Sequence, residues 1–188
     1  MHDAISTVLA PHAEYSAEHR LDTPRLVYPT AYTAAFAAAS VLASQDLALL
    51  ADVHLGPGLS EGLQLADHRT QRLRCFDPAT PGSAHWVLGR SAGYPVLVVI
   101  DATTRRRPVT VWDVVLRACR HHQAAVLAQV PWPTGTPDTL LDQLARATPL
   151  WAAVLPCPDG RGLVIGDQDL LVQMAAHPQT IALGGVVV

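Results

Sequence analysis

The feature that most constrains the fold is an apolar run over residues 94–100, which is interrupted only by Pro95. A run of this length, rich in β-branched residues and bounded by turn residues, predicts a strand that is buried on both faces. Residues 101–107 then form a polar, basic connection that is too charged to be buried. Residues 108–111 predict a short second strand, and residues 111–120 carry apolar side chains at helical spacing.

The predicted helix carries a start signal. Thr110 can cap its first turn, and Asp113 follows three residues later. A carboxylate at this position is favoured by the positive end of the helix dipole. The segment from residue 93 to residue 118 therefore predicts the order strand, basic turn, strand and capped helix.

The same order of elements recurs nearer the C-terminus. Residues 150–155 are apolar, residues 156–160 predict a turn, and residues 162–165 predict a short strand. Residues 166–169 then open a predicted helix over residues 170–176. A predicted helical segment precedes each unit, so the sequence predicts an internal repeat.

In this double unit, the sequence resembles a tandem pair of cystathionine-β-synthase-type (CBS) domains. The first unit carries Pro95-Val96 and the Thr-x-x-Asp of residues 110–113, as the family does; the second has Gly166 in place of the Thr or Ser. The resemblance covers residues 71–188 and implies an α/β fold of two β-α repeat units with pseudo-two-fold symmetry. Residues 1–70 are then expected to be a helical N-terminal extension.

The resemblance implies a regulatory module that senses an adenine nucleotide (AMP, ADP or ATP), without catalysis of its own. Asp113 would bind the ribose hydroxyls, and Thr110 would help the helix N-terminus to hold the phosphate. Arg105 and Arg107 would add positive charge, and Asp169 stands at the corresponding place in the second unit. The alternative is that Thr110 and Asp113 only cap their helix.

Composition narrows the classes of partner. Of the 188 residues, 49% are apolar, which is enough for a hydrophobic core, and the formal charge of -3 argues against a nucleic-acid or membrane surface. All 13 basic residues are arginine, so the chain contains no lysine. Three cysteines without close pairs make a disulfide framework unlikely, and the N-terminal sequence lacks the pattern of a signal peptide. These features predict a cytoplasmic protein.

Residues 30–50 form the longest helical candidate, which Thr30 or Thr33 can cap. Gln45 and Asp46 lie inside the stretch and its apolar residues are small, which argues against a transmembrane span. A helix packed closely against a partner is the better interpretation. We therefore expect a homodimer, with a regulated protein partner as a further possibility. The first alternative function is a non-enzymatic interaction or assembly protein that docks through helix 30–50.

Asp52 and His54 support a second alternative. Asp-x-His after an apolar run, followed by Leu-Gly, resembles the first metal-binding motif of calcineurin-like phosphoesterases, where the two side chains reach one metal. The alternative function is then a small metal-dependent phosphoesterase. Against this hypothesis, residues 52–56 can equally end a helix, with Gly56 as its stop signal.

Overall fold

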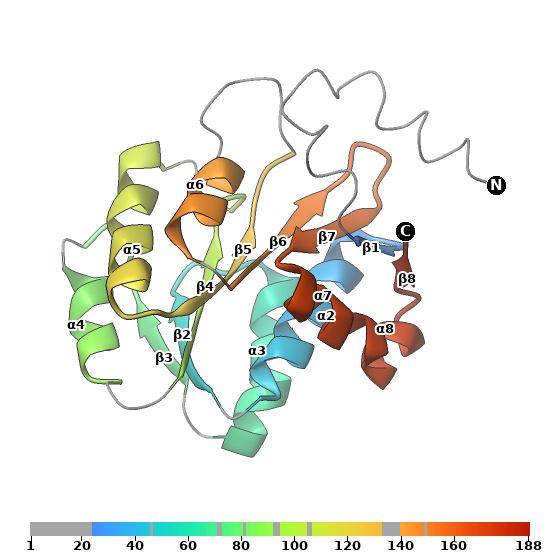
Figure 1. Cartoon of the computed structure of the whole chain (residues 1–188), viewed down its shortest axis with the longest axis horizontal. Helices are drawn as coiled ribbons and strands as arrows, with labels where there is room; N and C mark the ends of the chain where they lie inside the picture. Colours follow the sequence, from blue (N-terminus) through green and yellow to red (C-terminus); the bar gives the residue numbers. More distant parts are fainter. Residues whose placement is uncertain are drawn as a thin grey trace.

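The computed structural model describes residues 24–45, 47–70, 73–80, 82–91, 95–104, 107–132, 140–148 and 150–188. These residues form one sheet with helices on both faces (Figure 1). The eight strands have the order β3-β2-β4-β5-β6-β7-β1-β8. Their bounds are β1 (Leu26–Tyr28), β2 (Ala48–Asp52), β3 (Leu73–Phe76), β4 (Val96–Asp101), β5 (Ala125–Gln129), β6 (Trp151–Pro156), β7 (Gly162–Gly166) and β8 (Val186–Val187).

Strand direction divides the sheet into two parts. Strands β3, β2, β4, β5 and β6 are parallel, and each is joined to the next in sequence by a helix. Strand β7 returns antiparallel beside β6, and β1 and β8 continue the antiparallel pairing. The carboxyl ends of the five parallel strands therefore meet at one edge of the sheet, which we call the carboxyl edge.

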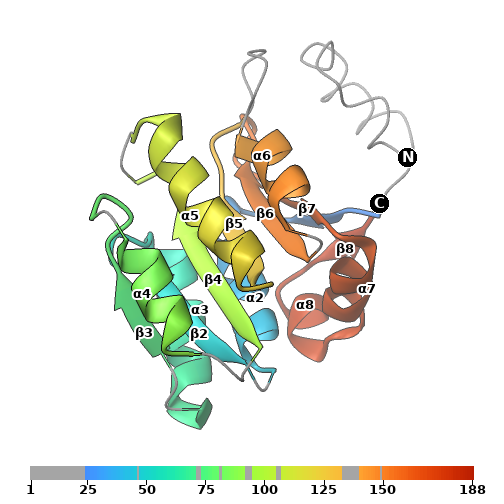
Figure 2. The ribbon, with the colours of Figure 1, turned by 60° about the vertical axis from the view of Figure 1, so that its left-hand side comes forward.

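Helices cover both faces of the sheet, as Figures 1 and 2 show. The described residues form seven helices. One hydrophobic cluster joins the sheet to α2 (Ala31–Ala43), α3 (Pro57–Thr70) and α7 (Gln168–Ala176), next to which α8 (Pro178–Ala182) lies. The second cluster joins the opposite face to α4 (Ser83–Gly89), α5 (Val109–His121) and α6 (Leu140–Ala147). The molecule thus has three layers, helices on either side of a central sheet.

Strand β4 confirms the apolar strand predicted over residues 94–100. All six of its residues are buried, because each face of the strand packs against a helical layer. Continuous apolar sequence is what a parallel strand covered on both faces requires.

Helix α2 confirms the predicted helix only as far as Ala43. Thr30 caps it as expected: its hydroxyl accepts a hydrogen bond from the Thr33 amide at 3.0 Å, and the Thr33 hydroxyl accepts one from the Thr30 amide at 3.2 Å. The remainder of the stretch is strand β2. Nine residues of α2 are buried against α3 and the sheet, so helix 30–50 is not the free docking surface that the sequence predicted.

The predicted repeat is wrong. In the first unit, a single strand, β4, leads into α5, and residues 109–111 belong to this helix rather than to a second strand. In the second unit, β6 and β7 form an antiparallel hairpin before α7. The units occupy different parts of one continuous sheet, so the α/β class is confirmed and the two-repeat CBS symmetry is not.

The predicted boundary at residue 70 falls between two paired strands. Strand β2 precedes it and β3 follows it, and the two are hydrogen-bonded in parallel. The described residues on either side of residue 70 thus contribute to the same sheet. No helix in the described part of the chain is both long enough and apolar enough to cross a lipid bilayer.

Candidate functional site

The centre of the carboxyl edge is the point where β2 and β4 lie side by side and their chains leave in opposite directions. After β2 the chain enters α3, which packs on one face, and after β4 it enters α5, which packs on the other. In open α/β sheets, ligands bind in the crevice that such a reversal creates outside the carboxyl ends of the strands. The loops that follow Asp52 and Asp101 are therefore the candidate site.

Asp101 joins these two loops. One carboxylate oxygen accepts a hydrogen bond from the Gly56 amide at 2.7 Å. The other accepts bonds from the Thr103 amide and hydroxyl at 2.7 and 2.6 Å, and from the Thr104 amide at 3.2 Å. A Cβ on Gly56 would lie 2.9 Å from the Asp101 carboxylate, so this close approach requires glycine. The loop after β2 is thereby fixed against the loop after β4.

Asp52 forms a second buried contact at the same edge. Its carboxylate lies 3.4 Å from an Arg107 guanidinium nitrogen, and the two side chains are 0% and 8% exposed. Another nitrogen of Arg107 lies 3.7 Å from Asp77, which follows β3. The guanidinium also lies over the Trp112 ring, 5.6 Å from its centroid. Arg107 therefore connects three elements at the edge, β2, β3 and α5.

The pKa of the Asp52 carboxyl group reflects its burial. Removal from water raises the pKa of the Asp52 carboxyl, because burial disfavours the charged form. The His54 amide, which donates to the carboxylate at 2.9 Å, and the positive charges of Arg107 and His54 oppose this rise in pKa. A carboxyl group whose pKa is raised by burial is suited to accept and return a proton.

The structure places only one of the predicted nucleotide-binding residues at the carboxyl edge. Arg107 is there, but it pairs with two carboxylates. Thr110 is exposed within the first turn of α5 and does not cap it, since the N-cap residue is Pro108 and forms no side-chain cap. Asp113 lies further along the same helix, and Arg105 lies outside the described residues.

Asp169 is far from this group. It is exposed in the first turn of α7, where Asp167 is the N-cap and accepts a hydrogen bond from the Asp169 amide at 3.1 Å. Because β7 runs antiparallel to β6, α7 begins at the edge opposite to the carboxyl edge. Asp169, the predicted ligand-binding residue of the second unit, is thus not brought together with Arg107 at the carboxyl edge.

Sequence reasoning missed Asp101 and Trp132. Asp101 was assigned to a solvated basic connection, although it is 1% exposed. The available signal was that two apolar strands, β2 and β4, each end in aspartate. Trp132 follows β5 at the same edge, and its indole N–H is buried without a hydrogen-bond partner among the described residues. A buried donor without an acceptor is unusual and indicates a missing partner.

The metal site expected from Asp52 and His54 is not formed. Within the described ranges, no group of three or more His, Cys, Asp or Glu side chains converges to hold a metal ion. The Asp52 carboxylate instead faces Arg107 and the His54 amide. Residues 52–56 also do not end a helix, because β2 precedes them and α3 follows.

Comparison with solved structures identifies the fold. Serine palmitoyltransferase from Sphingomonas wittichii is similar with a TM-score of 0.68 at 15% identity, over 94% of this chain and 44% of that one. A serine palmitoyltransferase solved with a pyridoxal phosphate (PLP) internal aldimine has a TM-score of 0.66 at 16% identity, over 82% and 41%. The Escherichia coli protein YbdL, described as a methionine aminotransferase, has a TM-score of 0.65 at 12% identity, over 95% and 50%.

These similarities correct the sequence-based assignment. The chain spans half or less of the length of these three structures. Its structural neighbours are PLP-dependent enzymes and not CBS domain pairs, so the CBS assignment was wrong. The expected nucleotide-sensing, non-catalytic regulatory function and the AMP, ADP or ATP ligand are overturned by the same finding. No protein-family model and no curated protein matches the sequence. At these identities, the chain shares the fold of PLP-dependent enzymes.

Proposed function

We propose that this chain is a domain of an enzyme whose reaction site is the carboxyl edge at the ends of β2 and β4. The site binds an anionic small molecule without a covalent bond, and Asp52 and His54 transfer protons there. The observation that carries this proposal is the buried Asp52–Arg107 pair, which lies at the reversal point of a sheet whose structural neighbours are enzymes.

The residues present do not fit PLP held as an internal aldimine. That bond is a Schiff base between the cofactor and a lysine amine. The sequence of 188 residues contains no lysine. The side chains of this chain therefore offer no amine for the bond, and we assign no step of the reaction to PLP.

The donors that remain at the edge suit an anion. Helices α3 and α5 both begin here, and the first turn of a helix offers free amide groups and the positive end of its dipole. The Trp132 indole contributes an N–H that lacks an acceptor among the described residues. A phosphate or carboxylate bound here would satisfy that donor.

Asp52 and His54 supply the acid–base chemistry. Arg107 fixes the Asp52 carboxylate from one side, and the His54 amide fixes it from another. Thr104 donates its hydroxyl hydrogen to the His54 carbonyl at 2.6 Å, which holds the backbone of that residue in the loop after β2. A carboxyl group with a raised pKa, at the end of a strand, is suited to accept and return a proton at a bound substrate.

Calorimetry with pyridoxamine 5′-phosphate tests the binding site. This probe carries a phosphate and its own amine, so it needs no lysine. We expect heat from the wild type and about ten- to a hundredfold weaker binding by Trp132→Phe, which removes one hydrogen bond to a charged group. The matched control is Trp86→Phe on α4, since Trp86 is 64% exposed. No heat from the wild type, or equal binding by the Trp132 variant, would contradict the proposal.

Three expectations from the sequence stay predictions. They are the homodimer, a regulated protein partner and the cytoplasmic location. The homodimer would need an interface other than α2, because α2 is buried within the domain.

A further inference from the structure

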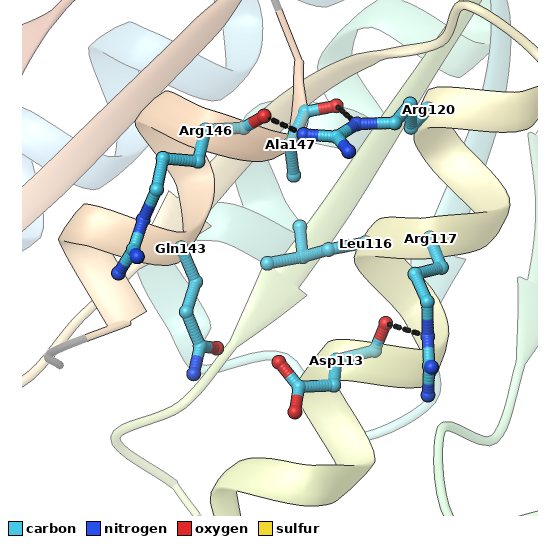
Figure 3. A pocket seen from close by; sticks show the side chains of 7 residues that line it. All are labelled: Asp113, Leu116, Arg117, Arg120, Gln143, Arg146 and Ala147. Carbon is cyan, nitrogen blue, oxygen red and sulfur yellow. Dashed lines mark hydrogen bonds between the residues drawn. The ribbon is translucent and has the colours of Figure 1, made fainter.

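A second site lies between α5 and α6, on the face of the sheet that these helices cover (Figure 3). The groove has a volume of about 350 Å³, and Leu116 lies in its centre. Its polar walls carry Asp113 and Arg117 from α5, and Gln143 from α6. None of these residues takes part in the contacts of the carboxyl edge described above.

Most of the charged side chains of the groove are arginines. Arg117, Arg120 and Arg146 line it together with one acid, Asp113. Arg120 is held in place because it donates to the carbonyls of Arg146 and Ala147 at the end of α6 (Figure 3). The Nε of Arg117 donates to the Asp113 carbonyl at 3.3 Å. Such fixed guanidinium groups favour a ligand with carboxylate groups.

One hydrogen-bond acceptor in the groove has no donor among the described residues. The side-chain oxygen of Gln143 is buried without a partner among the described residues, which destabilises the folded state unless a ligand supplies one. The Asp113 carboxylate extends into the same space from the opposite helix, as Figure 3 shows. A positively charged amine between these two acceptors would satisfy both.

We propose that this groove binds a free acidic amino acid, an α-amino dicarboxylate such as glutamate or aspartate. The ammonium group lies between Asp113 and the Gln143 oxygen, and the carboxylates face the arginines. The carboxylates of such a ligand complement the guanidinium groups of Arg117 and Arg120. This site is separate from the carboxyl edge, so either proposal can fail without the other.

Calorimetry with L-glutamate tests the groove, with glutarate as the matched ligand because it carries the same two carboxylates without the amine. We expect the wild type to bind L-glutamate at least about tenfold more tightly than glutarate, because only the former supplies the missing donor. Gln143→Leu should weaken L-glutamate binding about tenfold and leave glutarate binding unchanged. Arg117→Gln should weaken binding of both.

The control variant is Arg90→Gln at the end of α4, which should bind both ligands as the wild type does. Arg90 is exposed and lies over the exposed Trp86 ring, away from the groove. Melting temperatures of all variants should match the wild type within a few degrees, which separates loss of binding from loss of fold. The proposal is overturned if L-glutamate and L-aspartate give no heat. It is equally overturned if glutarate binds as tightly as L-glutamate, or if Gln143→Leu binds L-glutamate normally.

Discussion

Asp52 and Asp101 end neighbouring parallel strands, yet their surroundings differ. Asp101 accepts four hydrogen bonds from Gly56, Thr103 and Thr104, and so acts mainly on the loops around it. Asp52 pairs with Arg107, and burial raises its pKa. Asp101 therefore holds the loops of the carboxyl edge together, and Asp52 is the residue to which we assign proton transfer in the proposed function.

The Asp101→Ala substitution tests the structural role. Removal of the carboxylate leaves the amides of Gly56, Thr103 and Thr104 without their acceptor. We expect the free energy of unfolding to fall by about 2–4 kcal/mol in urea denaturation, because buried donors without partners destabilise the folded state. The exposed Asp169→Ala is the control and should lose less than about 1 kcal/mol. Equal losses in the two variants would refute this role.

The raised pKa of Asp52 predicts a pH dependence of stability. The folded state holds this proton more tightly than the unfolded state, whose carboxyl group has the ordinary pKa of 3.8. As the pH rises from about 4 through the folded pKa, the contribution of Asp52 to the free energy of unfolding should therefore decrease. Urea titrations over this range should show the wild type losing stability relative to Asp52→Asn. A difference that stays constant or increases with pH would show that the pKa is not raised.

Among the elements, helices α2 and α3 pack closely together because their facing residues are small. Gly62 of α3 lies against α2, where an added Cβ would be 2.7 Å from the Phe36 carbonyl oxygen and 2.8 Å from the Ala39 side chain. Gly58, one turn earlier, would similarly meet the Ala35 side chain at 2.9 Å. Small residues on both helices permit this approach, which explains the alanine-rich sequence of α2.

The Gly62→Ala substitution should reveal this packing. Alanine favours a helix over glycine by about 1 kcal/mol, but here its methyl group would push against backbone atoms that cannot move freely. We expect a net loss of about 1–3 kcal/mol in the free energy of unfolding. Gly89→Ala in α4 is the matched control, since an added Cβ there meets no atom within 4 Å and should not destabilise the protein. A Gly62→Ala protein as stable as the wild type would mean that α2 and α3 are further apart.

At the scale of elements, prediction from sequence succeeded for local features and failed for contacts between segments that are distant along the chain. The strand at β4 and the Thr30 cap follow from local patterns, and the structure confirms them. The CBS repeat failed because a strand followed by a helix has the same local pattern in many α/β folds. The pairing of β4 with β2, and of β7 with β1, joins segments distant in sequence and leaves no local signal.

Prediction of the candidate site was also limited, because its residues come from segments distant in sequence. Asp52 and His54 were noticed from their spacing. Arg107 was not recognised as the partner of Asp52, because it is 55 residues further along the chain than Asp52. Asp113 was singled out for a nucleotide site, whereas Gln143, which faces it across the groove, belongs to another helix and was not noticed. A residue type and its spacing can therefore suggest a site, whereas its partners depend on the sheet order.

On the scale of the whole molecule, the sheet ends at β8, whose residues are exposed. Val186, Val187 and Val188 are 59%, 54% and 48% exposed, and Ile181 nearby is 68% exposed. An apolar edge strand of this kind is a common surface for pairing with a second chain. It offers the predicted homodimer a surface other than α2.

Sedimentation equilibrium tests this association. We expect a mass of about twice 20.1 kDa for the wild type, and a shift towards the monomer for Val187→Lys, which places a charge on the edge strand. Leu65→Lys on α3 is the control, because Leu65 is 43% exposed and lies on another element. A wild-type protein of 20.1 kDa, or a Val187→Lys protein that remains a dimer, would show that β8 does not mediate dimerisation.

Amide NMR of the isotope-labelled chain during titration with pyridoxamine 5′-phosphate locates the proposed reaction site. We predict that chemical shifts change for the amides of Gly56, Thr103 and Thr104, which lie at the ends of β2 and β4, and for the indole N–H of Trp132. Saturating probe that changes no resonance, or that changes only resonances distant from these loops, would contradict an anion site at the carboxyl edge.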